Sequence, residues 1–209
     1  MNLTKQQIIQ WLTRCDQLFD EHKDYLTQLD TEIGDGDHGA NMHRGFTKVM
    51  EKLLTVTDKD IGTIFKTVGM TLLSSVGGAS GPLFGTFFIK GAQIAVNKQE
   101  LTLDELTQIL AVGVEGIVAR GRAEIGDKTM CDVWLPVVEV MRSSQDDLLN
   151  TLQSAVKKSE ECLVATISMK AKKGRASYLN ERSIGHQDPG ATSVVYMLQA
   201  LTETVVNKE

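Results

Sequence analysis

Residues 29–41 read LDTEIGDGDHGAN, and this stretch decides how the chain around it folds. It closes one helical pattern and opens the next, with glycines between them that let the backbone fold back sharply. Upstream, apolar residues from Ile8 to Leu29 recur every three or four positions, and Thr4 is a suitable N-cap for this first helix. Downstream, a second helix is expected from about Gly39 to Leu54. The stretch therefore predicts a sharp turn between two neighbouring helices.

The same helical period continues through the rest of the chain. Further helices are expected over about 61–73, 83–96, 102–121, 130–141, 147–172 and 190–206. Thr102 begins a capping box, TLDE, at the start of its helix. No run of alternating β-branched residues is bounded by hairpin turns. Eight helices with short connections predict an all-α, antiparallel bundle, with residues 1–209 forming a single domain.

Composition sets limits on what this chain can be. It has 209 residues, of which 42% are hydrophobic and 23% charged, so it can bury a core and is not a disordered protein. Lys and Arg total 22 against 27 Asp and Glu, for a formal net charge of −5. Phosphate backbones are held by clustered Lys and Arg, and this acidic chain has no basic stripe. We therefore expect no nucleic acid partner.

The cysteines and the N-terminus indicate a cellular setting. Cys15, Cys131 and Cys162 form no CxxC pair, and an odd number cannot fully pair within one chain, which favours a reducing cytoplasm. The N-terminal segment MNLTKQQIIQW has no apolar run typical of a signal peptide. No stretch approaches the ~18 apolar residues of a membrane span, so we expect a cytoplasmic protein without a membrane partner.

The glycines gather in four clusters, each between two expected helices. These clusters lie within 33–39, 77–82, 121–126 and 185–190. Each follows an odd-numbered helix of the expected series and precedes an even-numbered one. Because alternate connections of an antiparallel bundle share an end, we expect the four loops to meet at one end.

The first loop carries three carboxylates. Asp30, Asp35 and Asp37 fall within eight positions, and hard oxygen ligands on a tight loop suit Mg²⁺ or Ca²⁺. An EF-hand is excluded, because counting from Asp35 the sixth position is Ala40 rather than Gly, and the twelfth is Phe46 rather than Glu. The alternative is an acidic glycine turn that only caps the next helix.

Two of the loops run directly into helices. Residues 34–41, GDGDHGAN, and 77–81, GGASG, each precede a helix, whose first amides are unsatisfied donors in a positive field. Carboxylates beside such amides predict a site for a metal ion and a phosphate. The chain contains no GxxxxGK[ST] motif, so it is not a P-loop protein.

The other two loops offer different chemistry. Met130 can present a soft apolar surface to a flat ring, although packing in the core is the more common role of a Met. Arg175 can fork onto phosphate oxygens, and Asp188 precedes Pro189-Gly190 at the start of the last helix. Ser80, His38 and Asp188 also contain the groups of a nucleophilic triad, but no nucleophile-elbow sequence supports one.

Four segments together resemble the L subunits of dihydroxyacetone kinases, the ADP-binding subunits of phosphotransferase-system-dependent kinases. They are LDTEIGDGDHGANMHRGF (29–46), GGASGPLFGTFF (77–88), GDKTMCDVW (126–134) and GRASYLNERSIGHQDPGATS (174–193). They occur in the family's order along the whole chain. The resemblance implies an eight-helix antiparallel closed bundle, or barrel, with a nucleotide at one end.

The resemblance also implies roles for individual residues. Asp30, Asp35 and Asp37 would hold two Mg²⁺ ions. The remaining implied contacts are to the ADP phosphates from His38, Gly39, Ala40, Asn41, Ala79 and Ser80, to the adenosine end from Gly121 and Met130, and across the closed pocket from Arg175, Asp188, Pro189 and Gly190. Arg175 would also offset charge on the transferred phosphoryl group.

In such a family member, ADP is retained as a coenzyme. It takes a phosphoryl group from a phosphohistidine on an M subunit and passes it to dihydroxyacetone on a K subunit. The chain has the length of the L part alone, so these two subunits are its expected partners. Two alternatives remain at this point: an L-domain kinase subunit for another substrate, and a nucleotide-sensing module that contacts a transcriptional regulator.

Overall fold

The computed structural model describes residues 2–206, so residues 1 and 207–209 of the expected domain lie outside the described part. Within it, the chain is mainly helical, and the prediction of an all-α fold is confirmed. The helices are α1 (Lys5–Glu21), α2 (Lys23–Ile33), α3 (His38–Leu53), α4 (Ile61–Ser75), α5 (Ser80–Ile94), α6 (Leu103–Gly121), α7 (Cys131–Ser143), α8 (Leu148–Thr166), the 3-10 helix η1 (Arg175–Ser183) and α9 (Pro189–Val206).

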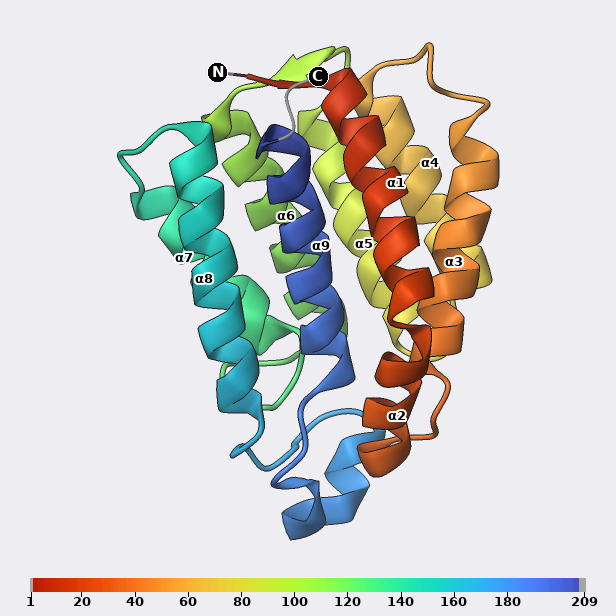
Figure 1. The fold of residues 1–209 in the computed structure, drawn as a ribbon, viewed down its shortest axis with the longest axis vertical. Helices are drawn as coiled ribbons and strands as arrows, with labels where there is room; N and C mark the ends of the chain where they lie inside the picture. Colours follow the sequence, from red (N-terminus) through yellow and green to blue (C-terminus); the bar gives the residue numbers. More distant parts are fainter. Residues whose placement is uncertain (1, 207–209) are drawn as a thin grey trace.

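The long helices pack as neighbours in the order of the chain. Contacts run from α1 to α3 and then through each successive helix to α9, which packs back on α1. Figure 1 shows these helices running alternately up and down, with α2 and η1 at the lower end. At the upper end, strands β1 (Leu3–Thr4) and β2 (Glu100–Leu101) pair antiparallel, with Leu3 opposite Leu101. The sequence did not predict this pair, because two residues are too few for an alternating pattern.

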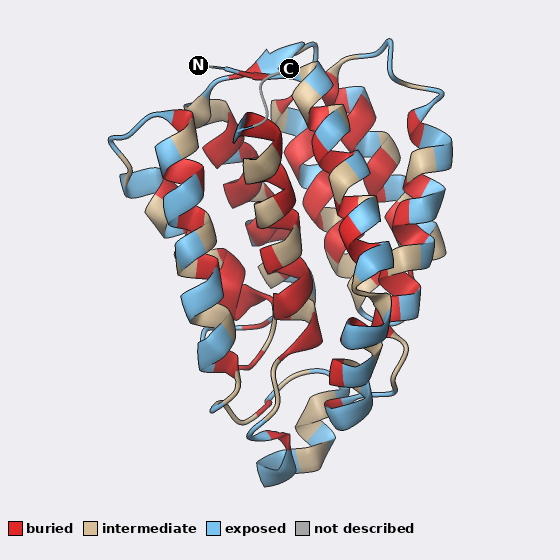
Figure 2. Ribbon diagram, in the orientation of Figure 1, coloured by how far each residue is buried: buried red, intermediate tan, exposed pale blue. Residues whose placement is uncertain are grey.

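An aromatic cluster fills the interior of the bundle. Trp11 lies 5.9 Å from Phe88 between ring centroids, Phe88 lies 5.2 Å from Phe87, and Phe87 stacks on Trp134 at 4.8 Å. Figure 2 shows the buried faces of the helices turned inward and the exposed faces outward. Such packing fixes the helices against one another, and therefore fixes the loops at their ends. No helix of the described chain combines the length and apolar character needed to cross a membrane.

The first expected helix is two helices. The backbone leaves helical geometry at His22, with φ −107° and ψ 12°, and α2 starts at the next residue. The His22 ring stacks on Tyr196 of α9 at 4.6 Å, a tertiary contact that a helical period cannot reveal. The break turns α2 away from α1 at the lower end of the bundle (Figure 1).

Two further helix boundaries differ from the expected ones. α5 begins at Ser80 rather than near Leu83, because Pro82 lies in its first turn, where the missing N–H has no helical partner to lose. α8 ends at Thr166 rather than near Lys172, because the carbonyls of Thr166 and Met169 accept hydrogen bonds from another part of the chain. Residues 167–187, called the lid below, therefore leave the bundle.

Candidate functional site

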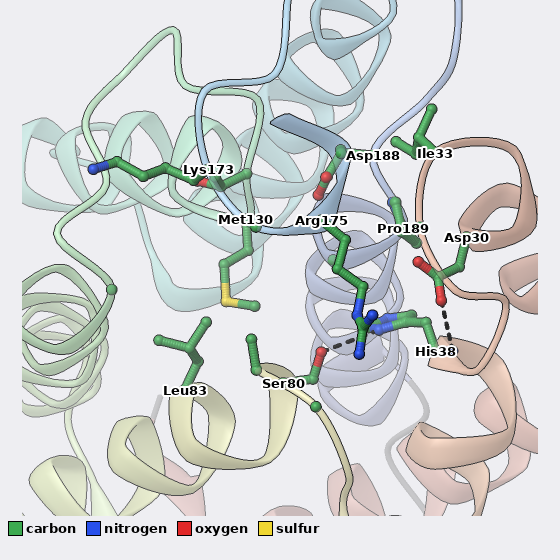
Figure 3. A pocket seen from close by; sticks show the side chains of 18 of the residues that line it. Asp30, Ile33, His38, Ser80, Leu83, Met130, Lys173, Arg175, Asp188 and Pro189 are labelled. Carbon is green, nitrogen blue, oxygen red and sulfur yellow. Dashed lines mark hydrogen bonds between the residues drawn. The ribbon is translucent and has the colours of Figure 1, made fainter. Parts of the chain in front are cut away.

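A pocket of about 310 Å³ lies at the end of the bundle opposite the strands, where the four glycine-rich loops meet. Its wall draws on residues from 30–41, 77–83, 117–131 and 173–190. The alternation of the helices therefore places four loops that are distant in sequence around one cavity. Figure 3 shows its two sides, with Met130 and Leu83 on one and Asp30 and His38 on the other.

Most of the residues singled out in the sequence line this pocket. They are Asp30, Asp35, Asp37, His38, Asn41, Ala79, Ser80, Gly121, Met130, Arg175, Asp188, Pro189 and Gly190. Gly39 and Ala40 are not part of the wall. A Cβ at Gly39 would lie 2.0 Å from the carbonyl oxygen of Lys23, so Gly39 allows α3 to pack against α2. Ala40 is exposed on α3.

The three aspartates of the first loop come together. One ligand oxygen from each of Asp30, Asp35 and Asp37 lies within 4.8 Å of the others. The Asp30 Oδ2 also accepts the N–H groups of Asp37, at 2.9 Å, and His38, at 3.1 Å. Gly34 permits this turn, because a Cβ there would lie 2.0 Å from Asp30 Oδ1. Grouped carboxylate oxygens are the donor set that Mg²⁺ and Ca²⁺ prefer, so these residues fit a divalent cation.

Arg175 connects the lid to this carboxylate group. Its Nη2 lies 3.0 Å from Asp35 Oδ2, and the Arg175 side chain is 65% exposed. An ion pair this exposed adds little to stability. The ion pair matters for its position. Among the described residues that line the pocket, Arg175 is the one arginine, and the pair places its planar guanidinium beside the carboxylates.

His38 joins three helices at the pocket floor. Its Nδ1 lies 3.1 Å from Ser80 Oγ, and its Nε2 lies 2.7 Å from Ser193 Oγ. Burial lowers the pKa of His38 to about 4, although the carboxylates of Asp30 and Asp37 oppose this shift. The imidazole is therefore neutral at pH 7 and acts through hydrogen bonds rather than charge.

The contacts of His38 do not form a nucleophilic triad. Ser80 lies beside the ring as a triad would require, but Ser193 rather than Asp188 occupies the other nitrogen. The Asp188 Oδ2 instead accepts the Ala191 N–H at 2.7 Å and caps α9. Burial raises the pKa of Asp188 to about 7, which the Ala191 hydrogen bond and Lys128 counteract.

Two helices begin in the pocket without a cap of their own. Within residues 2–206, neither Asp37 before α3 nor Ala79 before α5 accepts an N-capping hydrogen bond on its side chain. Asp30 accepts the N–H groups of Asp37 and His38 at the start of α3, whereas no side chain of the described residues is recorded as accepting the first amides of α5. The start of α5 therefore offers backbone donors and the positive end of a helix dipole to a ligand in the pocket.

The other side of the pocket is apolar. Met130 is 5% exposed, so it belongs to the core and also lines the pocket. A Cβ at Gly190 would lie 3.5 Å from Met130 Cε, and a Cβ at Gly121 would lie 3.3 Å from Leu83 Cδ2. These glycines keep room beside the apolar side chains. The pocket thus offers charged and amide groups on one side and a flat apolar surface on the other.

Some pocket residues were missed by the sequence analysis. They include Ile33, Leu83, Ile117, Ala123 and Thr129, with Lys173, Gly174 and Ala176 from the lid. Ile33, Leu83 and Ile117 also fit the helical apolar pattern, so nothing local distinguishes them from core residues. Ser193 lies within the quoted GATS segment, but its contact with His38 joins residues 155 positions apart.

Comparison with known proteins gives a consistent result. Residues 32–203 match the DAK2 domain family. The chain is 60% identical to "PEP-dependent dihydroxyacetone kinase, ADP-binding subunit DhaL" of Escherichia coli K12, over 96% of this chain and 97% of that protein. It is 42% identical to an ADP-binding subunit DhaL of PEP-dependent dihydroxyacetone kinase 1 from Listeria innocua, over 99% of this chain and 100% of that one.

A solved structure also shares the fold. The dihydroxyacetone kinase of C. freundii, in complex with AMP-PNP and Mg²⁺, superposes with a TM-score of 0.72 at 23% sequence identity. The match covers 92% of this chain and 33% of that one, so the present fold corresponds to about a third of a longer protein.

Proposed function

We propose that this chain, which belongs to the DAK2 domain family, is the ADP-binding subunit of a phosphoenolpyruvate-dependent dihydroxyacetone kinase. The observation that carries the proposal is the grouping of three carboxylates beside the uncapped start of α5, in one pocket with an apolar side. A nucleoside diphosphate with its metal ions needs each of these surfaces: oxygen ligands for the metal, amides for the phosphates and an apolar wall for the base.

Individual residues receive roles from their positions. Asp30, Asp35 and Asp37 would hold two Mg²⁺ ions, which offset phosphate charge when bound. The backbone of Ala79 and Ser80, with His38 and Asn41, would meet the phosphates. Gly39 and Ala40 would contribute through the backbone at the start of α3 rather than through the pocket wall.

The far side and the lid would complete the pocket. Gly121 and Met130 would border the adenosine end, and Asp188, Pro189 and Gly190 would close the pocket from the start of α9. The Arg175 guanidinium would stabilise the negative charge of the group being transferred, since it already reaches the carboxylates from the lid. The protein would then act by positioning and charge neutralisation, with no covalent nucleophile of its own.

The architecture supports this reading. The neighbour order, in which α9 returns to α1, fits an eight-helix closed bundle in which α2 extends the first helix and η1 belongs to the lid. Residues 1–209 would form one nucleotide-binding domain acting in the cytoplasm. Its partners would be a dihydroxyacetone-binding K subunit and an M subunit that carries a phosphohistidine.

Reconstitution of phosphoryl flow tests the function. The purified chain would be mixed with K and M subunits, the general phosphotransferase proteins, phosphoenolpyruvate and dihydroxyacetone, and dihydroxyacetone phosphate would be measured. We expect product only when this chain is present, with its nucleotide retained through many turnovers. Absence of product with active partners would contradict the proposal.

The same assay separates the alternatives. Free ATP that supports turnover by exchange, without phosphoenolpyruvate, would indicate a kinase subunit of another type. Nucleotide binding without any phosphoryl transfer, together with binding to a transcriptional regulator, would indicate a sensing module.

A further inference from the structure

The lid has little structure of its own to hold it over the pocket. Its one regular element, η1, is a 3-10 helix that is interrupted at Asn180, with φ 53°. Tyr178 near its middle is 81% exposed. Yet the lid brings Lys173, Gly174, Arg175 and Ala176 to the pocket wall. Some other part of the molecule must therefore fix it.

Lys128 contacts the base of the lid at four points. Its Nζ lies within hydrogen-bond distance of the carbonyl oxygens of Thr166 (2.8 Å), Met169 (3.1 Å), Ser183 (2.7 Å) and His186 (2.5 Å), so its three N–H groups are shared among four acceptors. Thr166 ends α8, Met169 lies close to the start of the lid, and Ser183 and His186 lie where the lid returns to α9. One ammonium group thus joins the segment that leaves α8 to the segment that returns to α9.

Two features of Lys128, its burial and its backbone conformation, each cost folding free energy. The residue is 1% exposed, so its charge has left water and depends on those carbonyls. Its backbone has φ 62°, a left-handed conformation that is unfavourable for a residue with a Cβ. Burial lowers the pKa of Lys128, and the nearby Asp188 carboxylate opposes that shift. The surrounding contacts must therefore outweigh both costs.

The same side chain links the lid to the apolar side of the pocket. Lys128 lies two residues before Met130, and the preceding Asp127 accepts the Lys172 backbone N–H at 3.0 Å through its carbonyl. Other hydrogen bonds close the lid base without Lys128, such as Gly185 N–H to the Ile167 carbonyl at 2.7 Å. Among the described residues at the lid base, Lys128 is the one that contacts both the outgoing and the returning segment of the lid through a single atom.

We propose that Lys128 is a positioning residue, whose buried ammonium group holds the lid across the pocket with Arg175 beside Asp35 and thereby slows nucleotide release. This inference rests on the proposed nucleotide site. Lys128 does not line the pocket, so its effect passes through the lid. The chemistry it supplies is a fixed charge that gathers carbonyls, which an apolar side chain of equal length does not replace.

The test compares Lys128→Met with Lys66→Met, which removes an exposed lysine from α4. Amide hydrogen exchange is measured on the nucleotide-free proteins, and release of radiolabelled Mg–ADP into excess unlabelled Mg–ADP is timed. We expect hydrogen exchange in the lid, residues 167–187, and Mg–ADP release to quicken at least about tenfold in Lys128→Met alone, because charge-assisted hydrogen bonds are lost. Exchange in α4 and α5 should not change. Wild-type rates for Lys128→Met would overturn the proposal.

A double-mutant cycle separates positioning from general loss of stability. Arg175→Ala should speed Mg–ADP release much less in the Lys128→Met background than in the wild type, because the unheld lid no longer presents Arg175. If the fold-changes in the Mg–ADP release rate of the two single variants multiply in the double variant, the proposal is overturned, since Arg175 would then act without Lys128. If Lys128→Met does not fold, Lys128→Gln, which keeps an N–H donor, must show an intermediate release rate.

The two measurements, hydrogen exchange and Mg–ADP release, also distinguish a failure of this inference from a failure of the proposed function. Failure of the wild type to bind Mg–ADP would contradict the proposed function, while hydrogen exchange would still report whether Lys128 holds the lid. Wild-type binding with an unaltered lid in Lys128→Met would contradict the inference alone.

Discussion

The two ends of the bundle differ in how the first turns of their helices are capped. At the strand end, α1, α4, α6 and α8 begin, and the side chains of Thr4, Asp60, Thr102 and Asp147 each accept a backbone N–H. At the pocket end, α3, α5 and α7 begin, and their N-cap residues make no such bond within the described chain. Asp188 caps α9 there, while Asp30 accepts the His38 N–H of α3 and Thr129 Oγ1 accepts the Cys131 N–H of α7, so among the described helices of this end α5 is the one whose first amides have no side-chain acceptor.

This difference separates stability from function. A capped helix start satisfies its amides within the protein and contributes to folding. An uncapped start beside grouped carboxylates keeps amides for a ligand at some cost in stability. Substitutions at the strand end should therefore change stability without changing nucleotide binding, and those at the pocket end should divide into packing and binding positions.

The largest effect on stability is expected from Gly39→Ala at the pocket end. The new Cβ would press on the Lys23 carbonyl at 2.0 Å and force α2 from α3, so we expect a loss of about 3 kcal/mol in the free energy of unfolding. Urea denaturation measures it. The control, Gly121→Ala, meets only Leu83 Cδ2 at 3.3 Å and should change stability by less than about 1 kcal/mol. If Gly39→Ala loses no more free energy of unfolding than Gly121→Ala, Gly39 is not a packing position.

A smaller loss is expected when Asp30 is changed. Asp30→Ala removes the acceptor of two α3 amides and should cost about 2 kcal/mol of unfolding free energy as well as nucleotide binding. Asp35→Ala is the comparison, because the one ion pair described for Asp35 is with exposed Arg175 and contributes little. Both variants should lose Mg–ADP in calorimetry. A stability loss in Asp35→Ala as large as that of Asp30→Ala would contradict these separate roles.

The smallest effect is expected at the strand end. Thr102→Ala removes the capping box with Glu105 at the start of α6 and should cost about 1 kcal/mol of unfolding free energy. Thermal unfolding measures the loss, and calorimetry should give an unchanged affinity for Mg–ADP. A weakened affinity would mean that the two ends are not independent.

Much of this division was readable from the sequence. The helical period gave the all-α class, and the caps at Thr4 and Thr102 followed from local patterns that need no tertiary information. The alternation of helices placed four loops at one end, which brought Asp30, Met130 and Arg175 to one pocket. Local chemistry and topology were sufficient for these features.

Other features depend on tertiary contacts between distant residues. The break at His22 accompanies stacking on Tyr196, and the early end of α8 accompanies hydrogen bonds from Lys128. The resemblance implied Gly39 as a phosphate contact, and the structure adds a packing role that the sequence does not reveal, because a Cβ there would meet the backbone of α2. Lys128 is buried and has a left-handed backbone, and its residue type disfavours both features.

Calorimetric titration of Mg–ADP into nucleotide-free protein tests the central claim most directly, that the carboxylates at the uncapped end form a metal–nucleotide site. The wild type should bind and lose binding on chelation of Mg²⁺, and Asp35→Asn should weaken affinity at least about 100-fold, or ~2.7 kcal/mol. Asp58→Asn, the same change at an exposed carboxylate between α3 and α4, should bind as the wild type does. Mg–ADP binding that is unaffected by Asp35→Asn, or a wild type that binds none, would contradict the account.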